Sequence, residues 1–294
     1  MHIAVCIKQV PDSAQIRVHP VTNTIMRQGV PAIVNPFDLF ALEEALRIKD
    51  ATGATVTVLT MGPPPAEEAL RKCLSFGADH AILITDKVFS GADTLATSFV
   101  LASALRTLNE RQPLDLIFTG KQTIDGDTAQ VGPGVAKRLE LELLTYVSRI
   151  VSVDQAANSI RVERRAEGGV QVLETRLPAL ITMLEGSNEI RFGSAPDMFR
   201  AARAEVRVWD RNAAGIEDIK KVGLKGSPTI VSRVFVPSPR AQKAQQIEFD
   251  AANPEAATQA LLDKVLVEIP KVKKQLDQTR DNKRAGRSAG ERHE

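Results

Sequence analysis

Short apolar runs alternate with amphipathic helical patterns along the first 150 residues of this chain. The runs are rich in Val, Ile and Leu and nearly unbroken, as expected of strands buried on both faces of a sheet. The candidate strands are Ile3–Ile7, Thr55–Thr60, Ala81–Ile84 and Leu114–Phe118. The candidate helices are Pro36–Asp50, Pro65–Phe76, Asp93–Leu108 and Thr128–Leu141. This rhythm predicts an α/β fold, with an open parallel sheet and helices on both of its faces.

After about residue 145 the pattern changes. Tyr146–Val153 and Ser159–Arg165 have the pattern of strands joined by a polar turn, and Gln171–Leu177 continues it. Leu184–Phe199 has the composition of a polar loop, and Asn253–Ile269 has helical spacing. Lys271–Glu294 is charged and has almost nothing to bury, which predicts disorder in isolation. We therefore expect an α/β domain over residues 1–236, an arm with a helix over 237–270 and a tail over 271–294.

Composition excludes several classes of protein. The net charge is +2, and the first 265 residues lack the basic patch with interleaved aromatics of a nucleic-acid binder. No apolar run approaches the ~18–20 residues of a membrane span, and the first residues lead straight into a strand without a signal-peptide pattern, so we expect a cytoplasmic protein. Two cysteines provide neither a disulfide framework nor a metal or iron–sulfur site, so redox chemistry would need an organic cofactor.

The segment Thr119–Pro133, after the fourth candidate strand, is the strongest candidate for a ligand site. Open parallel sheets bind ligands beyond the carboxyl ends of their strands. Backbone amides at the start of the following helix favour phosphate, and Thr128 and Gln130 add neutral donors. Gly126 and Gly132 would let the backbone approach a ligand closely.

The residues alone leave a second interpretation open. Glycine-rich loops also follow strands in α/β proteins that bind nothing there, and Asp127 could simply cap the helix. The chain has no G-x-G-x-x-G fingerprint, and Gly120-Lys121 lacks the upstream glycine of a P-loop.

Several separate motifs, in the same order, resemble the β subunits of electron-transfer flavoproteins over at least residues 1–235. The motifs are Val5–Asp12, Val34–Asp38, Glu43–Ala45, Met61–Pro63, Gly77–Asp79, Gly120–Pro133, Leu177–Ala179 and Asn188–Arg191. The resemblance implies a Rossmann-like nucleotide-binding domain with a C-terminal β-rich extension and an arm that packs on a partner α subunit. Any NADH-oxidising activity is then expected only in the assembled complex.

The resemblance also implies the residues of a nucleotide pocket. They are Cys6, Asn35, Pro36, Phe37, Asp38, Met61, Gly120, Asp125, Gly126, Asp127, Thr128, Ala129, Gln130, Val131, Gly132, Pro133, Gly134, Val135 and Ala136. Lys8, at the end of the first strand, is expected on the flavin side or the α-subunit side. Cys6 and Cys73 are expected to be buried structural residues rather than reactive thiols.

In one branch of the family this pocket holds AMP, and in another it holds a second FAD and the complex bifurcates electrons from NADH. Gly126 and Ala129 resemble the bifurcating branch, since the AMP branch has an acidic residue and an Asn there. The sequence is most similar to nitrogen-fixation-linked members. These imply electron transfer to a low-potential ferredoxin or flavodoxin and, through the α-subunit FAD, to quinone-oxidoreductase and ferredoxin-like partner subunits that associate with the membrane.

Two alternatives remain for function. One is a carrier without bifurcation, with AMP in the pocket. The other is a nucleotide-sensing module of the stress-protein type, although such modules end near residue 145. By resemblance, Leu184–Phe199 is a loop that docks redox partners through Ser187, Asn188, Glu189, Ile190 and Arg191. Ser187 replaces the protruding leucine of members linked to acyl-CoA dehydrogenases, which argues against that partner.

Overall fold

The computed structural model describes residues 1–12, 17–18, 25–26, 31–230, 247, 251 and 253–279. The chain divides into two compact units, Met1–Val236 and Pro237–Glu294, and each is described by itself. Within the described ranges, no helix combines the length and apolar character needed to cross a lipid bilayer.

A mostly parallel sheet of nine strands forms the first unit, with the order β11-β10-β9-β12-β8-β1-β6-β7-β13. The pairs from β9 to β13 along this order are parallel, and β10 is antiparallel to both of its neighbours. The strands are β1 His2–Cys6, β6 Thr55–Met61, β7 His80–Ile84, β8 Leu116–Gly120, β9 Glu142–Asp154, β10 Ser159–Ala166, β11 Gly169–Arg176, β12 Ala179–Met183 and β13 Val206–Trp209. The predicted α/β class is confirmed.

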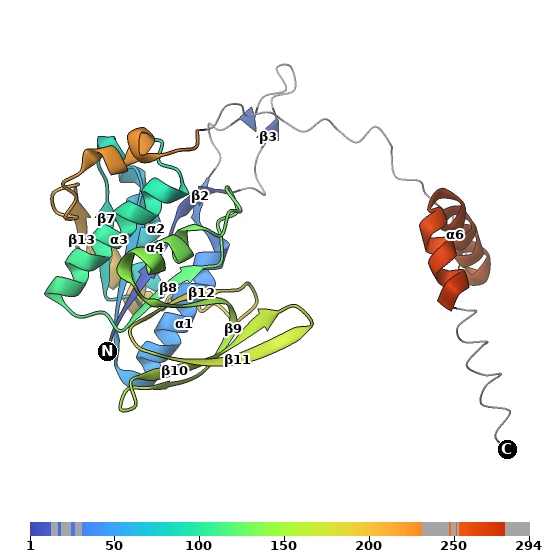
Figure 1. Cartoon of the computed structure of the whole chain (residues 1–294), viewed down its shortest axis with the longest axis horizontal. Helices are drawn as coiled ribbons and strands as arrows, with labels where there is room; N and C mark the ends of the chain where they lie inside the picture. The colour runs from blue at the N-terminus through green and yellow to red at the C-terminus, as the bar shows by residue number, and fades with distance from the viewer. Residues whose placement is uncertain are drawn as a thin grey trace. The chain divides into compact units, whose positions relative to one another are not determined.

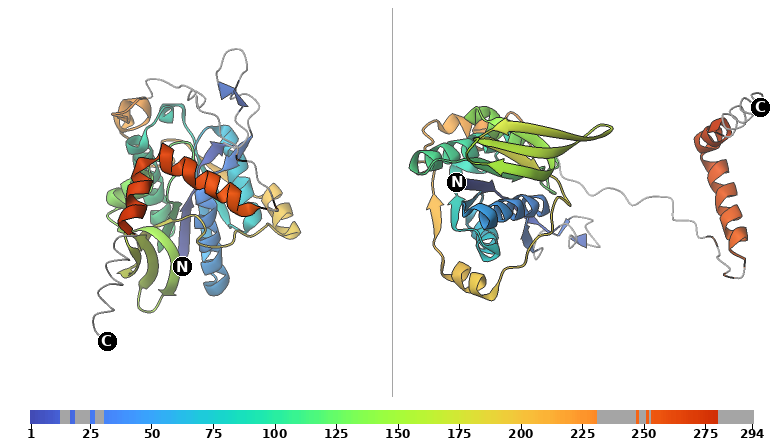
Figure 2. Two further views of the ribbon diagram at one scale, coloured as in Figure 1. Left: turned by 90° about the vertical axis from the view of Figure 1, so that its right-hand side faces the viewer. Right: turned by 90° about the horizontal axis from the view of Figure 1, so that it is seen from below.

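Helices cover both faces of this sheet (Figure 1 and Figure 2). One hydrophobic core contains residues of α1, α2 and α5, and the other contains residues of α3 and α4. The helices of the first unit are α1 Pro36–Thr52, α2 Glu67–Phe76, α3 Thr94–Arg111, α4 Val131–Leu139 and α5 Ala195–Arg203. Shorter elements are β2 Gln9–Pro11, β3 Arg17–Val18, β4 Ile25–Met26, β5 Ala32–Val34, η2 Pro64–Ala66, η3 Lys87–Phe89, η4 Ile219–Lys221 and η5 Gly223–Gly226.

The central strand β1 is buried along its whole length, which is why Ile3–Cys6 is an unbroken apolar run. The buried His2 before it forms a hydrogen bond with Thr57 at 2.8 Å. Val5 lies opposite Val58 of β6 on one side and Phe118 of β8 on the other. Successive side chains of β1 point into opposite cores, with Ile3 and Val5 in one and Ala4 and Cys6 in the other.

The structure differs from the sequence prediction in two strands and one helix. β12, between β8 and β9, and β13, at the edge beside β7, were not predicted. Both are short, and β12 follows a proline directly, which ended the predicted strand before it. β9, β10 and β11 extend the same sheet. α4 begins at Val131, not Thr128, so the loop before it is longer than expected.

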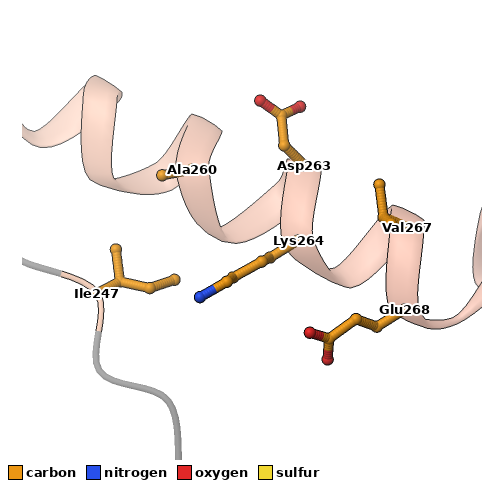
Figure 3. Close-up of a pocket in the computed structure, with 6 residues that line it drawn as sticks. All are labelled: Ile247, Ala260, Asp263, Lys264, Val267 and Glu268. Atoms are coloured by element: carbon orange, nitrogen blue, oxygen red, sulfur yellow. The ribbon is translucent and has the colours of Figure 1, made fainter.

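The second unit contains α6, Pro254–Glu268, close to the helix predicted over Asn253–Ile269. Residues 270–279 are also helical, where the sequence predicted disorder from Lys271; the remaining tail residues lie outside the described ranges. Figure 3 shows a shallow hollow in which Lys264 extends from α6 toward Ile247. The hollow belongs wholly to this unit and contains none of the candidate nucleotide-site residues.

Candidate nucleotide site

The strand order changes direction between β1 and β8, and we call the space beyond the carboxyl ends of these two strands the crevice. From β1 the sheet continues through β6 and β7 on one side and through β8 and β12 on the other. A reversal of strand order of this kind is where open α/β sheets bind ligands. Lys8 follows β1 and Lys121 follows β8, so two cations stand at the two strand ends.

At the crevice, Lys8 forms an ion pair with Asp125. Its Nζ lies 2.9 and 2.7 Å from the two carboxylate oxygens of Asp125. Partial burial of Asp125 opposes ionisation, but hydrogen bonds from Lys8 and Thr123 hold the pKa of this carboxyl below its usual value. The pair therefore ties the end of β1 to the loop after β8 while both groups stay charged.

Asp38, in the first turn of α1, connects the end of β1 to the end of β8 through hydrogen bonds. One carboxylate oxygen accepts a hydrogen bond from the Lys8 backbone N–H at 2.8 Å, and the other accepts from the Gly120 N–H at 3.0 Å. Burial raises the pKa of Asp38 to about 7, although hydrogen bonds from Lys8, Asn35 and Gly120 lower it. A Cβ at residue 120 would lie 2.6 Å from Asp38 Oδ1, so glycine is required there.

Asn35 holds the loop after β8 against the start of α1. Its buried side chain donates to the Gln122 carbonyl at 2.9 Å and accepts from the Ile124 N–H at 3.2 Å. It occupies the N-cap position of α1 but makes no side-chain capping bond. Its neighbour in the predicted set, Cys6, is buried, and burial raises the pKa of its thiol to about 12, consistent with a structural residue.

The backbone before α4 has an arrangement suited to an anion. Asp127 and Ala129 lie in the left-handed region with φ values of 52° and 55°. Gln130 is the N-cap, so the possible capping role of Asp127 is not realised; Asp127 accepts from the Gln122 side chain instead, at 2.8 Å. Among the described residues, no partner accepts the backbone N–H of Thr128, Ala129 or Gln130. Free amides at a helix start attract phosphate.

The glycines of this segment have different roles. A Cβ on Gly126 would meet only Thr123 Oγ1 at 3.5 Å, so this position has room for a side chain. A Cβ on Gly132 would lie 2.9 Å from Thr119 and Thr182, and one on Gly134 would lie 2.8 Å from Ser98. Gly132 and Gly134 therefore allow α4 to pack closely against its neighbours. This packing explains the glycine at position 132 without the close approach of a ligand that the sequence suggested.

The structure brings most of the predicted residues to one edge of the sheet. Pro36 and Phe37 begin α1 there, Met61 ends β6, and Val131 and Pro133 begin α4. Val135 and Ala136 are buried in the core beneath α4 rather than at the surface. Thr60, next to Met61, was not predicted; its hydroxyl is buried and has no hydrogen-bond partner among the described residues.

Lys121 and Tyr146 were also missed. The ammonium of Lys121 lies 5.4 Å from the ring centre of Phe37 and 5.8 Å from that of Tyr146, and 4.0 Å from Glu185. Tyr146 has a φ of 58°, which is rare for a bulky residue, at an irregularity in the pairing of β9 with β12. Its contact with Lys121 depends on this irregularity, which the sequence does not announce.

The predicted docking segment is fixed to α1 by two of its residues. Asn188 donates to the Phe40 carbonyl and to Glu44, and Arg191 forms hydrogen bonds of 2.8 and 3.0 Å with the buried Glu43 and of 2.8 Å with Asp50. Ser187 and Ile190 are half-buried and Glu189 is exposed. Phe192, which was not in the predicted set, is 92% exposed and is the side chain that projects.

Comparison with known proteins identifies the class. The electron transfer flavoprotein domain model matches residues 22–214. The chain belongs to the electron transfer flavoprotein family. Within the described residues, no group of three or more His, Cys, Asp or Glu side chains could hold a metal ion.

The relatives narrow the class to β-subunit-like members. The chain is 67% identical to "Protein FixA" of Azotobacter vinelandii over 276 residues, covering 94% of this chain and 98% of that protein. It is 64% identical to "Protein FixA" of Azorhizobium caulinodans, with the same coverage of both chains. It is 46% identical to "Electron transfer flavoprotein subunit beta" of Clostridium acetobutylicum, covering 79% and 87% of the two chains. The chain is therefore a β-subunit-like electron-transfer protein.

Proposed function

We propose that this chain pairs with an α subunit, holds FAD in the crevice between β1 and β8, and receives electrons from NADH. One electron would go to a low-potential ferredoxin or flavodoxin toward nitrogenase. The other would go through the α-subunit FAD to quinone-reducing partner subunits. The names of its relatives support the heterodimer and the link to nitrogen fixation. FAD supplies the hydride-accepting chemistry when bound, and the protein supplies position and charge.

The residues of the crevice fit a flavin dinucleotide. The free N–H groups of Thr128, Ala129 and Gln130 would bind one phosphate, and Lys8, by pairing with Asp125, would keep that carboxylate from repelling a pyrophosphate. Asp38 and Asn35 fix the strand ends and the loop around this space. The chain's own part is thus to bind and orient the dinucleotide.

The open space at Gly126 is the observation that carries the choice of FAD over AMP. The backbone there does not need glycine, since φ is not left-handed and a Cβ would fit. An acidic side chain would add a negative charge beside Asp125 and Asp127. Two like charges ~4 Å apart repel by about 4 kcal/mol at an effective dielectric of about 20. Glycine therefore keeps the loop compatible with a second phosphate.

The second unit supports the proposed α-subunit contact. Leu261, Leu262 and Val267 of α6 are exposed, Val267 by 78%. Apolar side chains grouped on one helix favour a protein partner. We propose that the arm, residues 237–270, packs on the α subunit, that the complex works in the cytoplasm, and that partner subunits bring it to the membrane.

A pair of substitutions at Gly126 tests the proposed cofactor. Gly126→Ala adds only a Cβ, for which there is room, and should leave the FAD content of the heterodimer unchanged. Gly126→Asp adds charge and should lower the affinity of this site for FAD by tenfold or more, while the α-subunit flavin stays bound. Equal FAD content in both variants would contradict the assignment.

A further inference from the structure

A group of lysines lies beside the candidate nucleotide site on η4 and η5. We call Lys220, Lys221 and Lys225, with the exposed Ile219, Leu224 and Leu95, the lysine surface. Lys221 pairs with Asp218 at 3.7 Å, whereas Lys220 and Lys225 have no ion-pair partner among the described residues. Lys220 and Lys225 are therefore cations without an ion-pair partner there. Glu217, Asp218 and Asp93 are the acidic residues near them, and the Asp93 carboxylate is already engaged by the start of α3 and by Thr229.

The sequence extends this bias. Between Ile219 and Gln246 there are six Lys or Arg residues and no Asp or Glu. The whole chain, by contrast, has nearly equal numbers of the two signs, with a net charge of +2. A one-sign segment of this length attracts a partner of the opposite charge.

Hydrogen bonds connect the residues that follow η5 to the start of α3, and the start of α3 to the candidate site. Ser227, at the end of η5, accepts a hydrogen bond from the Asp93 N–H at 2.8 Å, and the Thr229 hydroxyl donates to the Asp93 carboxylate at 2.7 Å. Asp93 caps α3, and the next residue, Thr94, donates to Gln130 at 2.7 Å. Gln130 is the N-cap of α4, so hydrogen bonds and the Asp93–Thr94 step of the chain join the residues that follow η5 to the predicted phosphate loop.

Packing holds the elements of this surface in place. A Cβ on Gly91 would lie 2.6 Å from Leu224, and one on Gly223 would lie 2.1 Å from the Val88 carbonyl. The Lys221 ammonium lies 5.6 Å from the ring centre of Phe99. Even so, Leu224 is 62% exposed and Leu95 49% exposed. Exposed apolar side chains near charged ones are typical of protein interfaces.

We propose that the lysine surface is the docking site for a small electron-carrier protein with an acidic face. This inference rests on the proposed function, since a carrier docked there would receive its electron from the proposed FAD. Charge complementarity selects the acidic partner, and the apolar centre at Leu224 favours a protein over a lipid surface or a nucleic acid. Docking there would bring the carrier close to the crevice at β1 and β8.

Binding of an acidic flavodoxin to the complete heterodimer tests the inference. The probe is a flavodoxin of acidic isoelectric point, measured by biolayer interferometry at 20 and 200 mM NaCl. The double variant Lys220→Glu, Lys225→Glu should weaken binding at least tenfold at 20 mM NaCl and flatten its salt dependence. The control Lys137→Glu, Arg207→Glu changes net charge equally at two exposed positions away from the lysine surface and should change binding less than twofold.

Three results would overturn the inference: parent binding without salt dependence, equal losses in the two double variants, or binding of phosphatidylglycerol vesicles in place of flavodoxin. NADH-dependent reduction of menadione, an uncharged quinone, separates the two proposals. If the parent complex reduces menadione but the lysine variant binds flavodoxin normally, the proposed function stands and the docking surface is wrong. If flavodoxin binding depends on the lysines but menadione is not reduced, the docking surface stands and the electron donor is wrong.

Discussion

Lys8 and Asp125 are joined by an ion pair in which the Lys8 ammonium lies 2.7 and 2.9 Å from the two carboxylate oxygens, 117 positions apart in sequence. The pair connects the end of β1 to the loop that precedes α4. Its side chains are 46% and 32% exposed, so its contribution to stability is small, about 0–1 kcal/mol. The pair matters for the proposed cofactor because Lys8 compensates the negative charge of Asp125 at the crevice.

Lys8→Met should weaken FAD binding about tenfold, because it removes a cation and leaves the charge of Asp125 uncompensated near the phosphates. The melting temperature of the cofactor-free heterodimer should change little. Equilibrium dialysis against FAD and thermal unfolding measure the two effects. A dissociation constant for FAD in Lys8→Met equal to that of the parent would contradict the proposed role of Lys8.

Asp38 should make stability depend on pH. Its pKa in the folded protein is raised to about 7 from an ordinary value of 3.8, so folding favours its protonated form. The stabilising contribution is fully present below about pH 4 and is lost as the pH rises through 7. At 1.36 kcal/mol per pKa unit, ionisation costs folding up to about 4 kcal/mol.

Asp38→Asn cannot ionise and isolates this effect. The melting temperature of the parent should fall between pH 5 and pH 8 relative to that of Asp38→Asn, because only the parent has a group that ionises over that range. Thermal unfolding of the heterodimer at several pH values gives this difference directly. A difference that stays constant with pH would show that Asp38 does not titrate there.

Arg191→Ala should destabilise the protein by roughly 2–4 kcal/mol, because the carboxylate of Glu43 is buried and would lose its cation. The matched control is Arg47→Ala, which removes the partner of the adjacent Glu44 from a more exposed position and should cost less than about 1 kcal/mol. Urea unfolding of both variants makes the comparison. Similar losses in the two would mean that Arg191 does not anchor the loop.

Ala129→Gly should stabilise the loop or leave it unchanged, within about 1 kcal/mol, because Ala129 has a φ of 55° that only glycine adopts freely. Ala51→Gly is the control, since Ala51 is exposed in the last turn of α1 and glycine there should cost up to about 1 kcal/mol. Thermal unfolding distinguishes the two. A loss at Ala129 larger than that at Ala51 would contradict the strain.

The sequence predicts the parallel sheet well because its strands are buried on both faces, so Ile3–Cys6 is apolar and Val56–Thr60 is apolar except for Thr57 and Thr60. β13 is harder to find, since an edge strand of four residues with two exposed side chains has no clear period. β12 is hard to predict because it begins directly after Pro178, a residue that usually marks the end of a strand.

The candidate site divides in the same way. Lys8, Asn35, Asp38 and Gly126 stand in motifs that mark the ends of strands, so the sequence indicates them. Tyr146 lies far along the chain in a strand whose pairing is irregular, and its approach to Lys121 depends on a left-handed φ that the sequence does not encode locally. Likewise, Phe192 projects because Arg191 and Asn188 are bound to α1, a long-range contact.

The cofactor content of the purified heterodimer tests the central claim most directly. Nucleotides released from the complex, prepared in buffer with added FAD, are separated by chromatography and counted per heterodimer. We predict two FAD and no AMP per heterodimer, with bleaching of the flavin absorbance near 450 nm when NADH is added. One FAD and one AMP per heterodimer, with no bleaching by NADH even after FAD is added back, would contradict it.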